Sequence, residues 1–486
     1  MATLSISRCI TELARRDPDR AAVTDHQGTL SRAELDRRTN RLARAYADLG
    51  VDRGDMVTIA LPNGCGFYEA AIAAWKLGAT PQPISARLPE SERDAVLELA
   101  DPALVVGAEV EGRTCLPADF EPDPALDEGE LPDVTAPEWK APTSGGSTGR
   151  PKLIVSREPG EFDPDEAGMM LMQGDDVQLV PGPLYHNGPF IFSFRGLFTG
   201  HHVVIMRRFD AEEALRLIER HRVGFVMMVP TMMQRIHRLD ESVRGAYDLS
   251  SLHTLLHLAA PCPPWLKQAW IDWLGPERIL ELYAGTEANG LTVIRGDEWL
   301  EHPGSVGRPV GCELRILDPE THEELPAGEV GEVFMRSRGG AGSTYRYVGG
   351  ERKEVDGFDT IGDLGWVDED GFLYLADRRT DLIISGGANV YPAEVEAAID
   401  QHPAVRSSAV IGLPDDDLGQ RVHAIVDATQ PLGEGELLDH LGRHLARYKV
   451  PRSVEFSDEG PLRADDGKVR RSQLREQRLP STGTSD

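Results

Sequence analysis

Residues 143–152 read TSGGSTGRPK, and this stretch decides how the rest of the chain is interpreted. Its three glycines let the backbone approach a ligand, its four hydroxyl side chains can donate hydrogen bonds, and Lys152 adds a positive charge. These groups suit an oligophosphate. The stretch differs from the P-loop of nucleoside triphosphatases, because Arg150 and Pro151 separate Gly149 from the lysine. On composition alone, a mobile linker is an equally good interpretation.

The composition predicts a folded protein of two or more domains. The chain has 486 residues, of which 40% are hydrophobic, enough for large cores. Its 80 Asp and Glu outnumber 51 Lys and Arg, and the formal charge of -29 disfavours nucleic acid or an anionic membrane as a partner. Anionic ligands therefore need a locally basic pocket. No apolar run approaches the length of a membrane span, and the start lacks a secretory pattern, so we expect a cytoplasmic protein.

Neither the cysteines nor the C-terminal residues predict a metal site, a disulfide or a cell-wall anchor. The five cysteines are far apart and without metal-ligand spacing, so we expect them to be reduced. They are Cys9, Cys65, Cys115, Cys262 and Cys312. Residues 479–483 read LPSTG, as in a cell-wall sorting signal, but only three residues follow, without the hydrophobic segment that such a signal needs. We expect residues 479–486 to be a frayed, polar terminus.

The first half of the chain predicts a layered α/β fold. Residues 31–50 have a helical pattern that Ser31 caps and Gly50 stops, and MVTIAL from residue 56 is typical of a strand. Residues 201–230 have the pattern strand, helix, strand, which indicates a mostly parallel sheet. Residues 116–140 are rich in Pro and acidic residues, so we expect a surface connection there.

The second half predicts two smaller units. Short strand patterns near residues 311–318 and 328–337 indicate a β-rich subdomain. From about residue 377 the sequence pattern changes: a charged stretch and a glycine pair precede a predicted helix that begins at Pro392. The rest of the chain is long enough for a small α+β domain. The predicted fold class is therefore α/β: layered, mostly parallel sheets with helices, a β-rich subdomain and a small C-terminal α+β domain.

Five more motifs follow the hydroxyl-rich stretch in order. They are PLYHNGPF from residue 183, LAAPCPP from 258, YAGTEANG from 283, IGDLGWVDEDGFLYLADRRTDLIISGGANVYPAEVE from 361 and PLRADDGKVRR from 461. Their order and spacing resemble the adenylate-forming superfamily, which includes acyl- and aryl-CoA synthetases, peptide-synthetase adenylation domains and beetle luciferases. The resemblance spans nearly the whole chain, up to Arg471. It implies an ATP- and acid-binding N-terminal domain, residues 1–379, and a mobile C-terminal domain, residues 380–486, that carries the catalytic lysine.

The resemblance assigns the first stretch to the β- and γ-phosphates of ATP, although Leu153 replaces the glycine usual after the lysine. Tyr283 would offer a flat face to adenine, and the carboxylate of Asp363 would accept hydrogen bonds from the ribose hydroxyls. Arg378 would contact the ribose or a phosphate. The implied ATP- and AMP-binding residues are Thr143, Ser144, Gly145, Gly146, Ser147, Thr148, Gly149, Lys152, Ala259, Ala260, Pro261, Tyr283, Gly285, Asp363 and Arg378.

The resemblance also implies catalytic roles for four residues. Thr286 would bind a phosphate, and Glu287 would hold Mg²⁺, which accepts one or two carboxylates together with phosphate oxygens. Lys468 would reach the carboxylate and the α-phosphate, where charge develops as the acid attacks ATP. His186 matches a position that lines the acyl pocket, and we assign it a positioning role.

The acyl pocket is implied to contain His186, Asn187, Phe190, Met232 and Gly285. The segments around these residues are apolar and rich in methionine, which suits an irregular hydrophobic guest. No Asp or Arg is placed there for the charged groups of an amino acid. The sequence looks most like actinobacterial acyl-CoA synthetases, so we expect a large hydrophobic acid, with polycyclic acids as candidates.

Attack of a thiol on the acyl-adenylate would need a different arrangement of the two domains from the one that forms the adenylate. The resemblance places the hinge at Thr380, where Asp or Lys is usual, and threonine puts a charge-based pairing of the hinge in doubt. Gly386 and Gly387 match the loop that narrows the thiol tunnel, where a side chain would obstruct it.

The expected activity is therefore ligation of a carboxylic acid to CoA through acyl-AMP, using ATP, Mg²⁺ and CoA. A stand-alone enzyme that loads an acyl carrier protein is the alternative, and an inactive nucleotide-binding protein is an alternative of another class. The oligomeric state stays open, with a homodimer as one option.

Overall fold

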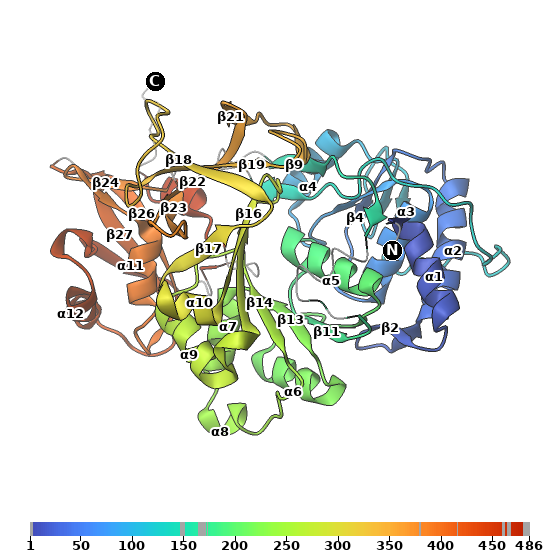
Figure 1. The fold of residues 1–486 in the computed structure, drawn as a ribbon, viewed down its shortest axis with the longest axis horizontal. Coiled ribbons are helices and arrows are strands. Elements are labelled where there is room, and N and C mark those ends of the chain that lie inside the picture. Colours follow the sequence, from blue (N-terminus) through green and yellow to red (C-terminus); the bar gives the residue numbers. More distant parts are fainter. Residues whose placement is uncertain are drawn as a thin grey trace.

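The computed structural model describes residues 3–145, 151–163, 172, 174–378, 381–415, 417–458, 462–463 and 468–479. The chain runs from the N-terminal helices at one end of the molecule to the C-terminal domain at the other (Figure 1). Within these residues, no helix combines the length and the apolar character needed to cross a membrane. The predicted hinge residue Thr380 and most of the predicted frayed terminus lie outside the described residues.

The centre of the N-terminal part is one 14-stranded sheet. Its strand order is β18-β19-β22-β23-β17-β16-β15-β14-β13-β11-β12-β2-β3, with β21 paired to β22. The strands are β2 (Ala21–Thr24), β3 (Thr29–Ser31), β11 (Val177–Val180), β12 (His202–Ile205), β13 (Phe225–Met228), β14 (Thr254–His257), β15 (Ile279–Ala284), β16 (Leu291–Arg295), β17 (Ser305–Pro309), β18 (Cys312–Leu317), β19 (Gly331–Ser337), β21 (Lys353–Val355), β22 (Phe358–Val367) and β23 (Leu373–Arg378).

The six strands from β2 to β15 form the parallel half of this sheet. The prediction of strand, helix and strand for residues 201–230 is confirmed by β12, helix α6 (Ala211–His221) and β13. Both strands pair with β11, so α6 crosses over that strand. Functional residues of such sheets gather beyond the carboxyl ends of the strands.

The expected β-rich part is present, but it is not a separate sheet. Strands β18, β19, β22 and β23 are antiparallel, and β17 joins them to the parallel half because it pairs with both β16 and β23. The two halves of the sheet are therefore held in one hydrogen-bonded register.

Helices cover the two faces of the parallel half and create two cores. One core lies between the sheet and α1 (Ile6–Arg16), α3 (Cys65–Lys76) and α5 (Asn187–Thr199). The other lies under α6, α7 (Pro230–His237) and α9 (Pro264–Leu274). Further helices of the N-terminal part are α4 (Glu90–Ala100), α8 (Glu241–Arg244) and α10 (Gly296–Glu301).

The N-terminal helices confirm the predicted capping. Helix α2 (Arg32–Asp48) begins after Ser31, whose hydroxyl accepts from the Glu34 amide while the Glu34 carboxylate accepts from the Ser31 amide. A four-stranded parallel sheet lies beside these helices in the order β5-β4-β6-β7. Its strands are β4 (Met56–Ile59), β5 (Thr80–Pro83), β6 (Leu104–Val106) and β7 (Cys115–Leu116).

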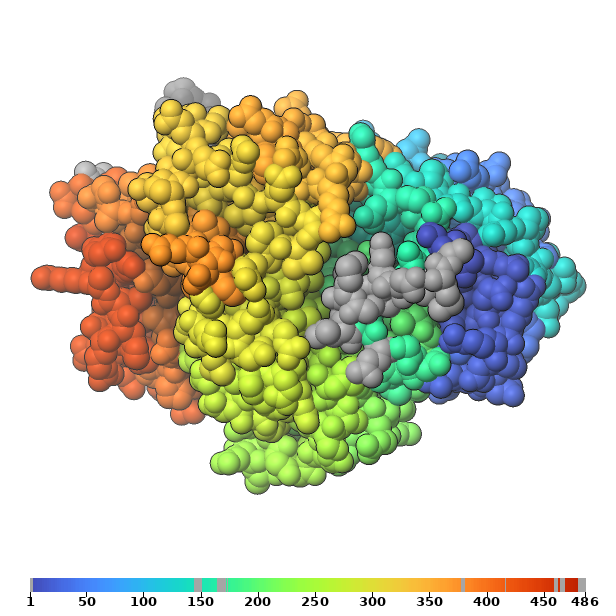
Figure 2. Space-filling model, viewed as in Figure 1, coloured from blue at the N-terminus to red at the C-terminus, as the bar shows by residue number. Residues whose placement is uncertain are grey.

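The predicted acidic connection, residues 116–140, contains no helix, and apart from Leu116 at the end of β7 it contains no strand. Its carboxylates pair with arginines of α1 and α2, such as Glu128 with Arg41 at 2.7 Å and Asp127 with Arg44 at 3.0 Å. Figure 2 shows this connection (teal) bordering the N-terminal helices (blue). Its last part is different, because Trp139 and Lys140 are buried.

The C-terminal domain has its own core and a five-stranded sheet. The strands are β24 (Ile383–Ser385), β25 (Ala388–Val390), β26 (Val405–Asp415), β27 (Gly419–Ala428) and β28 (Ser453–Phe456), and the helices are α11 (Pro392–Ile399), α12 (Glu434–His444) and α13 (Arg471–Glu476). The helix predicted to open at Pro392 is confirmed. Arg238, which follows α7, donates to the carbonyls of Asp400 and Arg406 at 3.1 Å each and so links the two domains.

Two buried charges stabilise the α9 side of the sheet. Lys267 on α9 donates to Glu281 on β15 at 2.5 Å, and both side chains are buried. His257 lies beside Glu281, and burial lowers the pKa of this histidine to about 4, so its ring is neutral at pH 7. The carboxylate therefore depends on Lys267 for its neutralisation.

We predict that Lys267→Met destabilises the protein by about 3–5 kcal/mol, because Glu281 is left buried and uncompensated. The double variant Lys267→Met/Glu281→Leu removes both charges and should recover most of this loss. Urea unfolding of the parent and both variants measures the difference. If the double variant were as unstable as the single one, lost packing rather than an unpaired charge would be the cause.

Candidate active site

The hydroxyl-rich stretch begins and ends on a hairpin. Strands β8 (Thr143–Gly145) and β9 (Pro151–Ser156) pair antiparallel, and β20 (Tyr345–Val348) pairs with the other edge of β9. Thr143 accepts a hydrogen bond from Gln82 at 3.0 Å, and Lys152 lies opposite Ser144. The predicted phosphate-binding residues between Gly146 and Gly149 lie outside the described residues.

Glu287 forms the centre of the site, and it is only 7% exposed. Its Oε1 accepts from the hydroxyl of Tyr347 at 2.6 Å and lies 3.8 Å from the Lys152 ammonium. Lys152 also lies over the Tyr347 ring, 3.8 Å from its centroid. The structure therefore brings the predicted metal-binding carboxylate and the predicted phosphate-binding lysine together.

The surroundings of Glu287 fit a magnesium ion shared with a ligand. A Cβ added to Gly285 would lie 2.8 Å from Oε2 of Glu287, so only glycine leaves that oxygen its present place. The described residues hold no cluster of three or more metal-ligating side chains. One carboxylate completed by phosphate oxygens is the donor set that Mg²⁺ uses at nucleotide sites.

The predicted adenine and ribose residues also meet. The Tyr283 hydroxyl donates to Oδ2 of Asp363 at 2.7 Å, although 80 residues separate them. Tyr283 lies on β15 and Asp363 on β22, opposite Arg378 of β23. Because β14 and β15 pair His257 with Glu281, Ala259 and Tyr283 each follow this pair by two residues. Ala259 has a φ of 76°, a strained conformation of the kind that gathers at binding sites.

The predicted acyl residues lie where α5 and α7 begin. His186 is the residue before α5, and its ring lies 4.3 Å from that of Tyr185. Oδ1 of Asn187 is buried and has no hydrogen-bond partner in the described part of the chain, so it can accept from a substrate. Phe190 is buried within an aromatic cluster with Trp75 and Trp139, and Met232 is buried on α7.

These segments follow the carboxyl ends of the parallel strands. Residues 181–186 follow β11, α7 follows β13, Ala259 to Pro261 follow β14, and Gly285 to Glu287 follow β15. Thr286 is half-buried between Gly285 and Glu287. The parallel half of the sheet thus delivers the predicted nucleotide and acid residues to one edge.

Among the residues that the structure describes, the predicted site residues of the C-terminal domain are not part of the contacts given above for Glu287 and Asp363. Lys468 is exposed on a segment between Arg463 and α13. Gly386 and Gly387 form the two-residue turn between β24 and β25, with φ angles of 58° and 80°. Glycine suits such a turn on backbone grounds alone. The roles of Lys468, the glycine pair, Arg378 and the other predicted site residues stay predictions.

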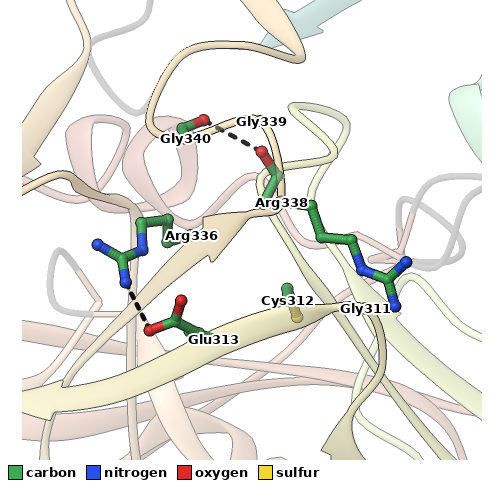
Figure 3. A pocket seen from close by; sticks show the side chains of 8 residues that line it. Gly311, Cys312, Glu313, Arg336, Arg338, Gly339 and Gly340 are labelled. Carbon is green, nitrogen blue, oxygen red and sulfur yellow. Dashed lines mark hydrogen bonds and ion pairs between the residues drawn. The ribbon is translucent and has the colours of Figure 1, made fainter.

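Two cavities lie near β20 and at the start of β18. One of about 390 Å³ is lined by Tyr345, Tyr347 and three arginines, of which Arg346 pairs with Glu138 and Arg352 with Asp359. The other, of about 680 Å³, is drawn in Figure 3, where Arg336 and Arg338 lie on either side of Cys312. Arg336 pairs with Glu313 at 2.6 Å, and none of the predicted site residues lines this cavity.

Tyr347 and Lys140 were not among the residues predicted from the sequence. Tyr347 is the hydrogen-bond donor to Glu287 from 60 residues away. Lys140, three residues before the hairpin, is only 4% exposed. Burial lowers its pKa to about 8, although the charges of Glu158 and Glu287 oppose this shift. The position of Lys140 close to TSGGSTGRPK could have indicated a role at the site, but its burial could not be predicted from the sequence.

We predict that Lys140 makes stability rise with pH in alkaline solution. Its folded-state pKa of about 8 lies below the usual 10.5, so between these values the unfolded chain holds a proton that the folded protein has lost. The cost of burying the charge, on the order of 3 kcal/mol, is relieved across that window. Lys140→Met should lack this rise. Urea unfolding of both proteins at pH 7 to 10 measures the difference, and parallel curves would contradict it.

Comparisons with known proteins agree with this arrangement. The family model of the AMP-binding enzyme matches residues 10–345, and that of the AMP-binding enzyme C-terminal domain matches residues 394–466. A feruloyl-CoA synthase of Amycolatopsis sp is 34% identical, over 95% of this chain and 96% of the relative.

Solved structures show the same fold. The o-succinylbenzoate CoA synthetase of Bacillus subtilis in complex with its acyl-adenylate intermediate is 27% identical and covers 98% of each chain, with a TM-score of 0.83. The same synthetase with ATP and a magnesium ion is 26% identical over 97% of this chain and 100% of the other, with a TM-score of 0.81. This protein therefore belongs to the AMP-binding enzyme family, the adenylate-forming superfamily that its motifs resemble.

Proposed function

We propose that this protein is an ATP-dependent acid–thiol ligase that joins a carboxylic acid to CoA. The observation that carries the proposal is the contact of Lys152 and Tyr347 with Glu287, beside the Tyr283–Asp363 pair, at the edge where the parallel strands end. The relatives support the reaction class, because one is named a CoA synthase and another holds an acyl-adenylate intermediate.

In the first half-reaction, a carboxylate oxygen of the acid attacks the α-phosphorus of ATP. The bond from that phosphorus to the bridging oxygen breaks, and pyrophosphate leaves. Lys152 and the hydroxyls of residues 143–148 would hold the leaving phosphates, and Asp363 would hold the ribose. Glu287 would hold Mg²⁺, which supplies charge neutralisation at the phosphates. Lys468 would stabilise the charge on the carboxylate and α-phosphate.

In the second half-reaction, the thiol sulfur of CoA attacks the carbonyl carbon of acyl-AMP. The carbon–oxygen bond to AMP breaks, the thiol proton leaves, and a thioester forms. We assign the alternation between the two geometries to rotation of residues 380–486 about Thr380, with Gly386 and Gly387 lining the path of the thiol.

The acid is proposed to be large and hydrophobic. The supporting features are the buried Phe190 and Met232 and the apolar segments that surround them. Oδ1 of Asn187 adds one acceptor for a hydroxyl or amide of the acid. A panel of aromatic, polycyclic and fatty acids, with amino acids as controls, read by pyrophosphate release, tests this. Selective turnover of amino acids would overturn the substrate class.

The acyl acceptor is tested by loading assays with CoA and with acyl carrier proteins, which read formation of the thioester. CoA is the proposed acceptor, and an acyl carrier protein is the alternative; a clear preference for a carrier would replace our choice. Failure to exchange labelled pyrophosphate into ATP with any acid of the panel would instead favour an inactive nucleotide-binding protein. We propose a cytoplasmic location, and a homodimer is the oligomeric state to test by size-exclusion chromatography.

We predict that Glu287→Gln makes adenylation much more dependent on Mg²⁺, because the side chain keeps its shape but loses its charge. Tyr347→Phe is the matched control, since it removes one hydrogen bond to Glu287 and leaves the carboxylate. We expect the Mg²⁺ concentration for half-maximal pyrophosphate exchange to rise at least about tenfold in Glu287→Gln, and less in Tyr347→Phe. An unchanged magnesium dependence in Glu287→Gln would remove the metal assignment.

We also predict that Lys468→Ala and Gly387→Leu affect opposite half-reactions. Lys468→Ala should lower adenylation by about 10²–10³-fold and spare thioester formation from supplied acyl-AMP. Gly387→Leu should do the reverse by obstructing the thiol.

A Cβ on Gly387 meets nothing within 4 Å in this structure, so backbone strain is the main folding risk of Gly387→Leu. Gly387→Asn, which tolerates the left-handed backbone better, is the matched control for that strain. Equal loss of both half-reactions in folded Lys468→Ala would contradict the alternation of two geometries.

A further inference from the structure

Lys468 begins the short stretch of residues 468–470, the Lys468 segment, and an arginine on either side of this stretch in the sequence binds one buried carboxylate. Glu396 lies on α11 and is only 2% exposed. Arg463, before the segment, donates to its Oε2 at 2.8 Å. Arg471, after the segment, donates from Nη2 to both carboxylate oxygens at 2.9 Å. Two arginines that flank the predicted catalytic lysine thus converge on the same side chain.

Glu396 is itself fixed by the C-terminal sheet. Its Oε1 accepts from the Val410 amide of β26 at 2.8 Å. Next to Lys468, Val469 packs on an apolar patch of β26 and β27, and the Leu462 amide donates to Ser407 at 3.0 Å. The anchoring points of the segment are therefore a rigid strand and a helix rather than solvent.

Arg471 also reaches the start of the C-terminal domain. Its Nη1 donates to Oδ2 of Asp381 at 2.7 Å, and Asp381 is the residue after the predicted hinge Thr380. One guanidinium thus joins the residue beside the hinge, the carboxylate of α11 and the end of the Lys468 segment. Arginine suits this place because its planar fork can serve several acceptors at once, which a lysine ammonium does less well.

We propose that Glu396 is a positioning residue for adenylation, which together with Arg463 and Arg471 holds the Lys468 segment in the orientation that neutralises the reacting phosphate. This inference rests on the proposed function. Because Arg471 also binds Asp381, a rotation about the hinge carries the lysine with the domain as one unit. In the thioester-forming geometry Lys468 is withdrawn, so the anchoring no longer contributes.

The test compares the half-reactions of Glu396→Gln. We expect adenylation with the best acid of the panel to fall on the order of 10²-fold, the cost of a catalytic group displaced by about 1 Å. Thioester formation from supplied acyl-AMP should stay within about threefold of the parent, since Lys468 does not act in that step. Arg471→Gln is a second variant if Glu396→Gln fails to fold, and the same ratio is expected from it.

A double-mutant cycle shows whether Glu396 acts through Lys468. In the Lys468→Ala background, Glu396→Gln should have no further effect on adenylation, because the group that it positions is absent. The control is Arg478→Lys, which weakens the two-contact pair of Arg478 with Glu455 in the same domain, away from the segment. It should lower the melting temperature without changing the ratio of the half-reactions.

The outcomes separate the inference from the function on which it rests. Equal losses in both half-reactions, additive losses in the double variant, or an unchanged adenylation rate in folded Glu396→Gln would each overturn the positioning role. If the parent protein itself failed to exchange pyrophosphate with any acid, the proposed function would fail first.

Discussion

The hydrogen bond between Tyr283 and Asp363 depends on the continuity of the large sheet. Tyr283 belongs to the last parallel strand, and Asp363 belongs to the antiparallel half, which β17 attaches to it. A sheet has one register, so pairing of β15, β16, β17, β23 and β22 in sequence fixes where Asp363 lies. The relative position of these two predicted nucleotide-binding residues is therefore a consequence of strand pairing.

Several buried charges are neutralised by a neighbouring charge. Lys267 pairs with Glu281, Lys152 approaches Glu287, and Glu396 binds two arginines in the C-terminal domain. Lys140 is buried as well, and burial lowers its pKa to about 8 although the charges of Glu158 and Glu287 oppose this shift. An anionic ligand bound close to Lys140 would favour its charged form.

Much of the fold and of the candidate site could be predicted from the sequence, because the motifs and their order can be read directly along the chain. The superfamily, the fold class and the ligase class are confirmed, and so are the Ser31 cap and the helix at Pro392. The contacts of Tyr347 with Glu287 and of Arg471 with Glu396 span 60 and 75 residues. No local pattern encodes such pairs, since they follow from strand register and domain packing. The domain boundary and the residue roles stay predictions.

The acidic connection is attached by different forces in its middle and at its C-terminal end. Residues 127–130 contact α1 and α2 through partly exposed ion pairs, whereas Trp139 and Lys140 are held by burial. Ion pairs of the first kind are weak and are screened by salt, and burial is not. High ionic strength should therefore loosen the middle of the connection and expose it to proteases there, while the end that leads into the β8–β9 hairpin stays in place.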